Sequence, residues 1–347
     1  MNDYDQPPEL YDGLRLHQNE NTGGCSPRVL EALAALRPDQ IAFYPPYSSV
    51  IDSCARHLGV SADSLVLTNG LDEGILAVAI DRLRSSAGGF VPEAIIPEPA
   101  FEIFGFDAEV VGARVVRVMP QPDFVFALDD VLAAITPRTR VVFITNPNNP
   151  TGVAVAETAI QRVAREVPSD AVVFLDETYA EFAEHTFIPD LGRFPNVVVG
   201  RSFSKSYGLA GLRAGALVGH PDLIATLRRA VPVYSLNAAS VAALQAAIGD
   251  QEYLRNYLSQ VKESKALLYA ACDHLGLKYW RSAANFVLVR TPGRAADLVA
   301  AAAERGIYLR DRSNEPGCSG CIRVTTGVVE HTRRAIAVLD EVLCAAR

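Results

Sequence analysis

The segment Arg201-Ser-Phe-Ser-Lys205-Ser-Tyr-Gly-Leu-Ala-Gly-Leu-Arg213 brings hydroxyls, an amine and a guanidinium into one glycine-containing stretch. It follows the apolar run 197–199, which is typical of a buried strand. A lysine that condenses with the aldehyde of pyridoxal phosphate needs anion-binding groups beside it, because that cofactor also carries a phosphate. Ser202, Ser204 and Arg213 could bind the phosphate while Lys205 takes the aldehyde. A solvated loop lysine beside an ordinary turn is the alternative.

A second pattern lies upstream, in Ala171-Val-Val-Phe-Leu-Asp176-Glu-Thr-Tyr179. Five apolar residues that end in a carboxylate predict a buried parallel strand with Asp176 at its carboxyl end, where open α/β sheets bind ligands. A buried aspartate that faces a pyridine nitrogen would keep that nitrogen protonated and make the ring an electron sink. Tyr179 could reach the phenolic oxygen of the same ring. A helix-capping aspartate after a core strand is the alternative.

Two further loops follow predicted strands. Val141-Val-Phe-Ile-Thr-Asn-Pro-Asn-Asn149-Pro-Thr-Gly152 offers three amide side chains to an oxygen-rich ligand, although a plain turn uses the same residue types. Asn69-Gly70-Leu71-Asp72-Glu73 places a glycine at a strand-to-helix turn, where free backbone N–H groups can bind an anion. Such glycine turns are also frequent without a ligand.

The order of these motifs resembles the class I and II aminotransferases of pyridoxal-phosphate fold type I, and within them most closely the histidinol-phosphate aminotransferase branch. The resemblance extends from residues 16–21 to residues 319–327. It implies an α/β protein with the PLP-dependent transferase fold type I, in which a large doubly wound mixed-sheet domain is joined to a smaller α/β domain.

The resemblance also implies roles for individual residues. The turn at Gly70, through the backbone of Leu71 and Asp72, would hold the cofactor phosphate together with the hydroxyls and the arginine of the lysine segment. Phe101 would stack on the pyridine ring, and Asn149 would join Tyr179 at the ring oxygen. Tyr44 would reach the neighbour's phosphate, which implies a homodimer with a shared active site.

Substrate binding is expected to involve arginines, because a guanidinium holds a carboxylate or phosphate bidentately. Arg323 matches the family's carboxylate-binding position, and Arg310 matches the arginine that meets the substrate phosphate in the histidinol-phosphate branch. Asn19 and Asn237 are further pocket candidates. The chain departs from the branch at Gly23, where a bulky residue is usual and a roomier pocket is expected. The arm before Asn19 is also short, and Tyr11 could replace its substrate-contacting aromatic residue.

The predicted activity is that of a pyridoxal-phosphate-dependent aminotransferase with a ping-pong cycle. The amino donor would be histidinol phosphate or an amino acid, and the acceptor a 2-oxo acid such as 2-oxoglutarate. Lys205 would act as general base and acid. The alternatives are a decarboxylase of a phosphorylated amino acid, an aromatic amino acid aminotransferase and a non-catalytic protein of the same fold.

Composition excludes several other classes of protein. A net charge of −8 argues against nucleic acid or an anionic membrane as a partner. No apolar run approaches the roughly 20 residues of a membrane span, and the N-terminus lacks signal-peptide character, so a cytoplasmic location is expected. Cys318 and Cys321 have CxxC spacing, but no second pair completes a zinc site, so no metal is expected.

The 347 residues can bury one large and one smaller core. Alternating strand and helix patterns predict a large cofactor-binding domain over residues 40–245, with residues 1–39 and 246–347 forming the small domain. The N-terminal segment through residue 36 is expected to pack on the small domain, and residues 254–275 to form a long crossing helix. Strands are predicted at 65–70, 94–97, 115–118, 141–144, 172–175, 197–199, 215–218, 286–289 and 307–309, and helices at 156–166 and 221–231.

Overall fold

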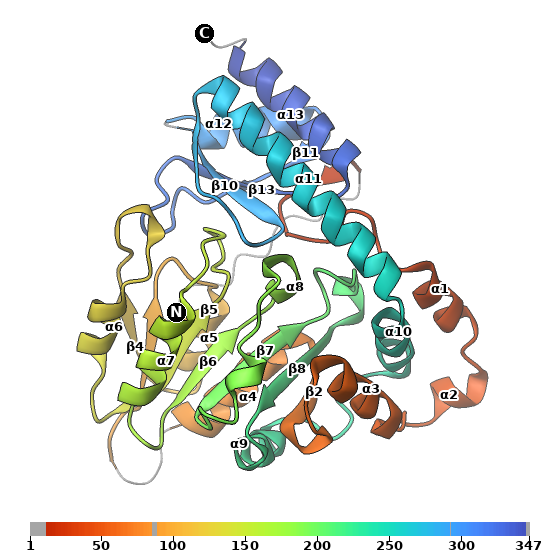
Figure 1. Ribbon diagram of the computed structural model, residues 1–347, viewed down its shortest axis with the longest axis vertical. Helices are drawn as coiled ribbons and strands as arrows, with labels where there is room; N and C mark the ends of the chain where they lie inside the picture. Colours follow the sequence, from red (N-terminus) through yellow and green to blue (C-terminus); the bar gives the residue numbers. More distant parts are fainter. Residues whose placement is uncertain (1–11, 85–88, 292, 345–347) are drawn as a thin grey trace.

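The computed structural model describes residues 12–84, 89–291 and 293–344. A seven-stranded sheet in the order β2-β8-β7-β6-β5-β3-β4 forms the centre of the larger part of the molecule (Figure 1). The strands from β3 to β7 run parallel, whereas β8 is antiparallel to both β2 and β7, so the sheet is mixed as predicted. Its strands are β2 (Leu65–Asn69), β3 (Glu93–Pro97), β4 (Arg114–Val118), β5 (Thr139–Thr145), β6 (Val172–Asp176), β7 (Val197–Ser202) and β8 (Ala214–Gly219).

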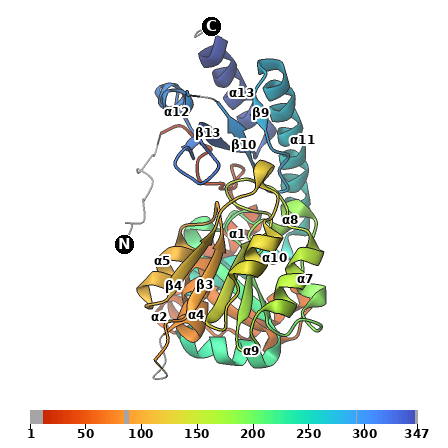
Figure 2. The same ribbon diagram turned by 90° about the vertical axis from the view of Figure 1, so that its left-hand side faces the viewer.

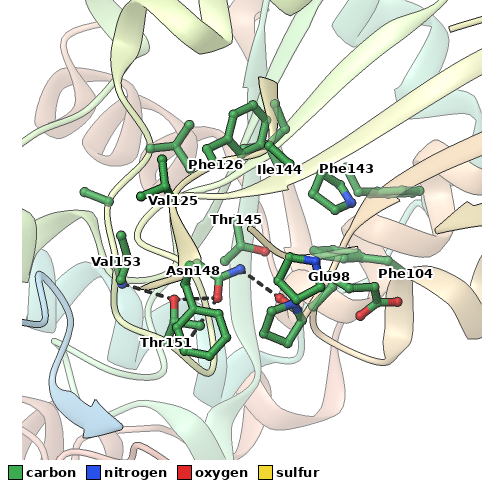
Figure 3. A pocket seen from close by; sticks show the side chains of 18 residues that line it. Glu98, Phe104, Val125, Phe126, Phe143, Ile144, Thr145, Asn148, Thr151 and Val153 are labelled. Carbon is green, nitrogen blue, oxygen red and sulfur yellow. Dashed lines mark hydrogen bonds between the residues drawn. The ribbon is translucent and has the colours of Figure 1, made fainter. Parts of the chain in front are cut away.

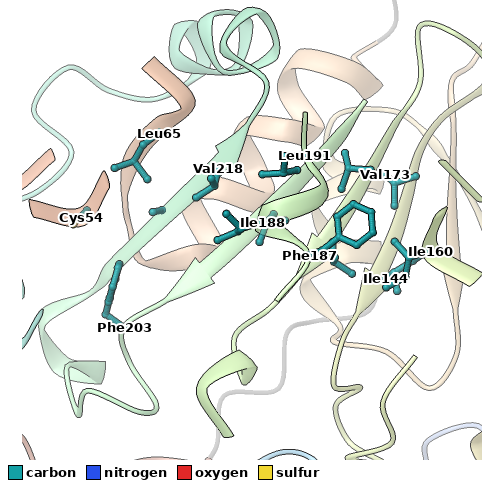
Figure 4. Packing of buried hydrophobic residues seen from close by; sticks show 14 of the residues in the cluster. Cys54, Leu65, Ile144, Ile160, Val173, Phe187, Ile188, Leu191, Phe203 and Val218 are labelled. Atoms are coloured by element: carbon teal, nitrogen blue, oxygen red, sulfur yellow. The ribbon is translucent and has the colours of Figure 1, made fainter. Parts of the chain in front are cut away.

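Both faces of the inner strands β5 to β8 are buried, which explains why these strands have long apolar runs, whereas the edge strand β4 is largely exposed. Because side chains alternate along a strand, Val173 and Leu175 of β6 face one helical layer, while Val172 and Phe174 face the other. Figure 4 shows the first of these faces. Phe174 is fully buried, and burial of such a side chain contributes about 1.5–3 kcal/mol to stability.

Two groups of helices cover the two faces of the large sheet (Figures 1 and 2). The first group is α1 (Pro27–Ala34), α3 (Ser48–Leu58), α6 (Leu128–Ala134), α7 (Glu157–Glu166) and α10 (Ala238–Gly249), and the second is α4 (Gly70–Leu83), α5 (Ile103–Val110) and α9 (Pro221–Leu227). Shorter pieces are α2 (Pro38–Ala42), α8 (Ala180–Ala183), η1 (Ala62–Ser64), η2 (Pro122–Phe124), η3 (Ile188–Asp190), η4 (Ala210–Leu212) and η5 (Arg228–Ala230).

The smaller part contains an antiparallel sheet in the order β12-β13-β10-β9 and a parallel pair, β1 with β11. Its core lies between this small sheet and three helices. The strands are β1 (Leu14–Arg15), β9 (Lys278–Tyr279), β10 (Phe286–Arg290), β11 (Ile307–Tyr308), β12 (Arg310–Asp311) and β13 (Cys321–Thr325), and the helices are α11 (Gln251–Leu275), α12 (Ala295–Glu304) and α13 (Val329–Cys344).

Helix α11 joins the two parts, as predicted for residues 254–275 (Figure 1). The Asp250 side chain caps its first turn, and Gly276 ends it in the left-handed conformation at φ 67°. Leu254 belongs to the core of the large sheet, whereas Leu268 and Leu275 belong to the core of the small part.

The N-terminal segment divides between the two parts, which corrects the prediction that all of it packs on the small domain. Strand β1 pairs with β11 of the small part. Helix α1 instead packs against α10, and its Val29 is fully buried in the core of the large sheet. The amphipathic pattern of α1 gave no signal for which of the two cores it would cover. The division at residues 40 and 245 stays a prediction.

Candidate active site

A cleft of about 530 Å³ lies at the carboxyl ends of β6 and β7, where the large sheet faces the small one. Its volume is in the usual range for small-molecule sites, roughly 300–1,000 Å³. Most of the residues predicted from sequence line it: Asn19, Leu71, Asp72, Phe101, Asn149, Asp176, Tyr179, Ser202, Ser204, Lys205, Arg213, Arg310 and Arg323.

Lys205 lies in the loop that follows β7 and is partly buried. Its Nζ donates a hydrogen bond to the backbone oxygen of Gln18 over 2.9 Å. Burial, reinforced by the positive charge of Arg323, lowers the pKa of Lys205 from 10.5 to about 8. The deprotonated fraction of Lys205 at neutral pH is therefore larger than that of an exposed lysine. The deprotonated amine is the nucleophilic form.

Asp176 is the last residue of β6 and is buried at the floor of the cleft. Its Oδ1 accepts a hydrogen bond from the backbone N–H of Thr178 over 2.9 Å. Burial raises the pKa of this carboxyl from 3.8 to about 6, against the opposing effect of the Thr178 hydrogen bonds. A cationic ring nitrogen beside it would offset this desolvation and hold the carboxylate in its charged form.

Tyr179 and Asn149 both line the cleft, and each hydrogen-bonds to another lining residue, Tyr179 to Asn19 and Asn149 to Arg323. The Tyr179 hydroxyl accepts a hydrogen bond from Asn19 Nδ2 over 2.9 Å, and burial raises the pKa of Tyr179 to about 12. Arg323 donates from Nη1 to Asn149 Oδ1 and from Nη2 to the backbone oxygen of His17, the latter over 2.7 Å. Burial, and then the charges of two neighbouring arginines, lowers the pKa of Arg323 to about 9.

The turn at Gly70 forms a cradle that can hold a phosphate. Gly70 has φ 74°, and a Cβ atom there would lie 2.5 Å from Arg213 Nη2, so only glycine lets the guanidinium come this close. Arg213 Nη2 also donates to Asp72 Oδ2 over 2.8 Å. The N-terminus of α4, Ser202 and Ser204 border the same space. These donors fit the phosphate of pyridoxal phosphate.

A buried ion-pair network supports the lysine loop from behind. Arg201 donates to Glu177 Oε2 over 3.1 Å and also to Glu181, and all three carry almost completely buried side chains. Ser206, next to Lys205, donates to Glu181 Oε2 over 3.1 Å. Removing one member would leave a buried charge unpaired, which is strongly destabilising. This network therefore fixes the position of the loop that carries Lys205.

Only one of the three amides in the 146–152 loop lines the cleft, which corrects the expectation that all three face a ligand. Asn146 Oδ1 accepts from the backbone N–H of Val155 over 2.9 Å. Asn148 Nδ2 donates to the backbone oxygen of Pro99 over 3.0 Å, and its Oδ1 accepts from the Thr151 hydroxyl (Figure 3). The cavity beneath this loop is only about 40 Å³, enough for a water rather than a cofactor. Asn146 and Asn148 thus shape the loop that presents Asn149.

Asn237 and Gly23 do not line the cleft, and neither does Tyr44, which was predicted to act at the neighbour's cofactor. Asn237 is the N-cap of α10, and its Oδ1 accepts from the backbone N–H of Ser240 over 2.8 Å; capping accounts for this asparagine. Tyr44 is 73% exposed and stacks on Tyr234 with ring centroids 4.0 Å apart, outside the cleft. Gly23 does not line the cleft, since a Cβ atom there would meet Asn21 and Val328 within 3.3 Å. The roomier pocket expected from Gly23 stays a prediction, and Tyr11 lies outside the described residues.

The cleft also contains residues that sequence reasoning missed. Arg312 follows Arg310 by two positions, and the period of a strand could have indicated that both side chains share a face. Glu102 follows Phe101 directly. Burial lowers the pKa of His17 to about 4, so this side chain is neutral near pH 7. The other such lining residues are Gln18, Glu20, Ile75, Thr178, Ala210 and Gly211.

The cysteines of the CxxC pair do not line the cleft. Cys318 and Cys321 are buried free thiols that pack with Trp280 and Leu288. Within residues 12–84, 89–291 and 293–344, no group of three or more His, Cys, Asp or Glu side chains is placed to hold a metal ion. Over the same ranges, no helix combines the length and the apolar character that crossing a bilayer requires.

Comparison with known proteins agrees with this geometry. The family model for aminotransferase class I and II matches residues 11–339. A histidinol-phosphate aminotransferase of Symbiobacterium thermophilum is 36% identical, over 96% of this chain and 91% of the relative, and one of Geobacillus sp. is 34% identical over the same shares. The crystal structure of histidinol-phosphate aminotransferase from Sinorhizobium meliloti in complex with pyridoxal-5'-phosphate has a TM-score of 0.86 at 26% identity, covering 97% of this chain and 92% of that one.

The family match spans nearly the whole chain, and the cleft combines a partly buried lysine, a buried carboxylate and a cradle that can hold a phosphate. The chain therefore belongs to the class I and II aminotransferases and is a pyridoxal-phosphate-dependent aminotransferase of fold type I.

Proposed function

We propose that the protein transfers an amino group from histidinol phosphate, or a closely similar phosphorylated amine, to a 2-oxo acid such as 2-oxoglutarate. The observation that carries this proposal is the presence of three arginines, Arg310, Arg312 and Arg323, in the cleft that contains Lys205. An amino donor with a phosphate and a dicarboxylic acceptor both need such cationic groups. The similarity to histidinol-phosphate aminotransferases supports the same choice of donor.

In this proposal each part of the cleft holds one part of the cofactor. Arg213, Ser202, Ser204 and the backbone at the start of α4 bind its phosphate. Phe101, which lines the cleft, would stack on the ring. The Asp176 carboxylate would hold a proton on the ring nitrogen, and Tyr179 and Asn149 would hydrogen-bond to the ring oxygen.

Bound pyridoxal phosphate supplies an electron sink for negative charge at the donor carbon that carries the amine. Lys205 Nζ would be joined to the aldehyde carbon with loss of one water molecule, and the amine of the donor would displace it there. The freed Nζ would then be placed to remove the proton from the donor carbon and to return a proton later in the cycle. The lowered pKa of Lys205 suits both tasks, since the group can gain and lose a proton near neutral pH.

The pH dependence of cofactor capture tests the environment of Lys205. Burial disfavours the charged ammonium and lowers its pKa, so the reactive free amine forms as the pH rises through about 8 rather than 10.5. We expect the rate at which apoprotein develops its visible absorbance with pyridoxal phosphate to increase with a midpoint near pH 8. A midpoint near that of an exposed lysine would show that Lys205 is not held in a desolvated site.

Arg310 is the proposed contact for the donor's phosphate, and Arg323 for the carboxylate of the 2-oxo acid. Replacing Arg310 by alanine should lower kcat/KM for histidinol phosphate by about tenfold or more, equivalent to about 1.5–3 kcal/mol. Phenylalanine, which has no phosphate, should be affected far less. Side-by-side kcat/KM values for the two donors test this role, and equal losses would exclude a phosphate contact at Arg310.

We also propose a homodimer in which Tyr44 contacts the neighbour's cofactor phosphate. Several large apolar side chains have more than half of their area exposed, as expected at a protein interface: Ile41, Phe43, Tyr44, Val233 and Tyr234. Sedimentation should therefore give about twice the chain mass of 37.4 kDa. Tyr44→Ala should weaken pyridoxal phosphate binding about tenfold through loss of one charge-assisted hydrogen bond. A single-chain mass with undiminished activity would contradict the proposal.

A further inference from the structure

Three arginines share one face of the small sheet. Arg310 of β12 lies directly opposite Arg323 of β13, and the backbone N–H of Arg312 continues the ladder by donating to Cys321 over 2.9 Å. Cross-strand partners, and residues two apart on one strand, have side chains on the same face. Leu309, Ile322 and Val324 occupy the opposite face and pack on the helices. The three guanidiniums therefore project into the cleft.

Two carboxylates from different parts of the chain hold Arg312. Its Nη2 is 3.0 Å from Glu315 Oε1, in a pair whose side chains are only 8% and 15% exposed. Its Nη1 is 3.9 Å from Glu102 Oε1, and the Glu102 side chain is 42% exposed. A strong charge-assisted hydrogen bond is about 2.7–2.9 Å long. Glu315 is thus the fixed partner of Arg312, and Glu102 is the weakly held one.

The charge around Arg312 favours an anionic ligand. Arg310 and Arg323 lie in the same cleft, and the positive charges of the arginines repel one another. A phosphate monoester carries about −1.5 to −2 near pH 7, which is more than a single guanidinium neutralises. The carboxylate of an amino acid carries one charge. A dianionic group between Arg310 and Arg312 would relieve the repulsion between the arginines and replace Glu102 at Nη1.

We propose that Arg312 is a specificity-determining residue, which together with Arg310 binds the dianionic group of the donor in exchange for Glu102. Glu315 keeps the guanidinium in position during this exchange. The inference rests on the proposed function, since it concerns the donor pocket of the same cleft. Arg312 would be a second contact for the phosphate, beside Arg310, and Glu102 would be the carboxylate that competes with the phosphate. Both residues line the cleft.

Histidinol phosphate and histidinol are suitable probes, because they differ only in the phosphate. The measured quantity is the ratio of their kcat/KM values in the holoenzyme. Arg312→Gln should lower this ratio about tenfold or more, and Arg312→Lys should lower it less, because lysine keeps the charge and loses the bidentate geometry. Glu102→Gln should raise the ratio about threefold by removing the competitor. Arg305→Gln is the matched control, since Arg305 is exposed, pairs with Glu341 and lies outside the cleft; it should leave the ratio unchanged.

The opposite signs expected for Arg312→Gln and Glu102→Gln separate recognition from structural damage. Equal losses for both donors in Arg312→Gln, or a lower ratio in Glu102→Gln, would overturn the inference. If Arg312→Gln does not fold, Arg312→Lys and Glu102→Gln still decide it. A wild-type ratio near one would instead refute the proposed donor. Calorimetry with inorganic phosphate then tests Arg312 alone: about tenfold weaker binding to the Arg312→Gln holoenzyme supports the inference, and equal binding refutes it.

Discussion

Lys205→Ala should abolish turnover, with kcat reduced by at least about 10⁴-fold, because one substitution removes both the expected covalent anchor of the cofactor and the group expected to move the proton. The protein should also lose the lysine–cofactor link that borohydride fixes, as seen by mass spectrometry. Noncovalent pyridoxal phosphate should remain bound, since Arg213 and the turn at Gly70 are intact.

Lys265 offers a matched control for this variant. It is another lysine whose pKa burial lowers to about 8, and its Nζ donates to the backbone oxygen of Ser282 over 2.9 Å, outside the cleft. Lys265→Ala should keep kcat within about threefold of the wild type. If Lys205→Ala transaminates at the wild-type rate, or if both lysines are equally required, the role given to Lys205 is wrong.

Replacing Asp176 by alanine should lower kcat by about 10³-fold, because the ring nitrogen loses the anion that holds its proton. The cofactor should still bind and still react with Lys205, since neither the phosphate cradle nor the lysine loop is altered. Asp176→Asn should behave like the alanine variant, as it keeps the volume and loses the charge. Single-turnover rates, normalised to bound cofactor, separate this effect from cofactor loss.

Asp107 provides the comparison for Asp176. It is also a buried carboxyl, with its pKa raised to about 7 by burial and by the charge of Asp72, but it does not line the cleft. Asp107→Asn should change kcat by no more than about threefold. Near-normal kcat in Asp176→Ala would mean that Asp176 only caps the end of β6.

The parts of the fold that could be predicted were those that depend on a pattern within a short stretch of sequence. Long apolar runs predicted the inner strands of the large sheet, because both faces of those strands are buried. Loops that directly follow those strands were predicted to form the site, since the carboxyl ends of parallel strands meet at one edge. Asp176 and Lys205 reach the same cleft for this reason.

The remaining features depend on contacts between distant segments, for which the sequence has no local signal. The Asn19–Tyr179 and Gln18–Lys205 hydrogen bonds each join positions more than 150 residues apart. The buried Arg201 network and the pairing of Glu102 with Arg312 arise in the same way. Asn237 shows the converse: an amide side chain serves equally as a ligand or as a helix cap, and only the structure distinguishes the two.

We infer that this cleft transfers an amino group from a phosphorylated donor under the control of Lys205. The most direct test is a product balance for purified holoenzyme supplied with histidinol phosphate and 2-oxoglutarate. We expect one glutamate for each molecule of the corresponding ketone, with neither product formed by Lys205→Ala. Absence of glutamate, while the enzyme still releases carbon dioxide from a phosphorylated amino acid, would show that the cleft catalyses decarboxylation instead.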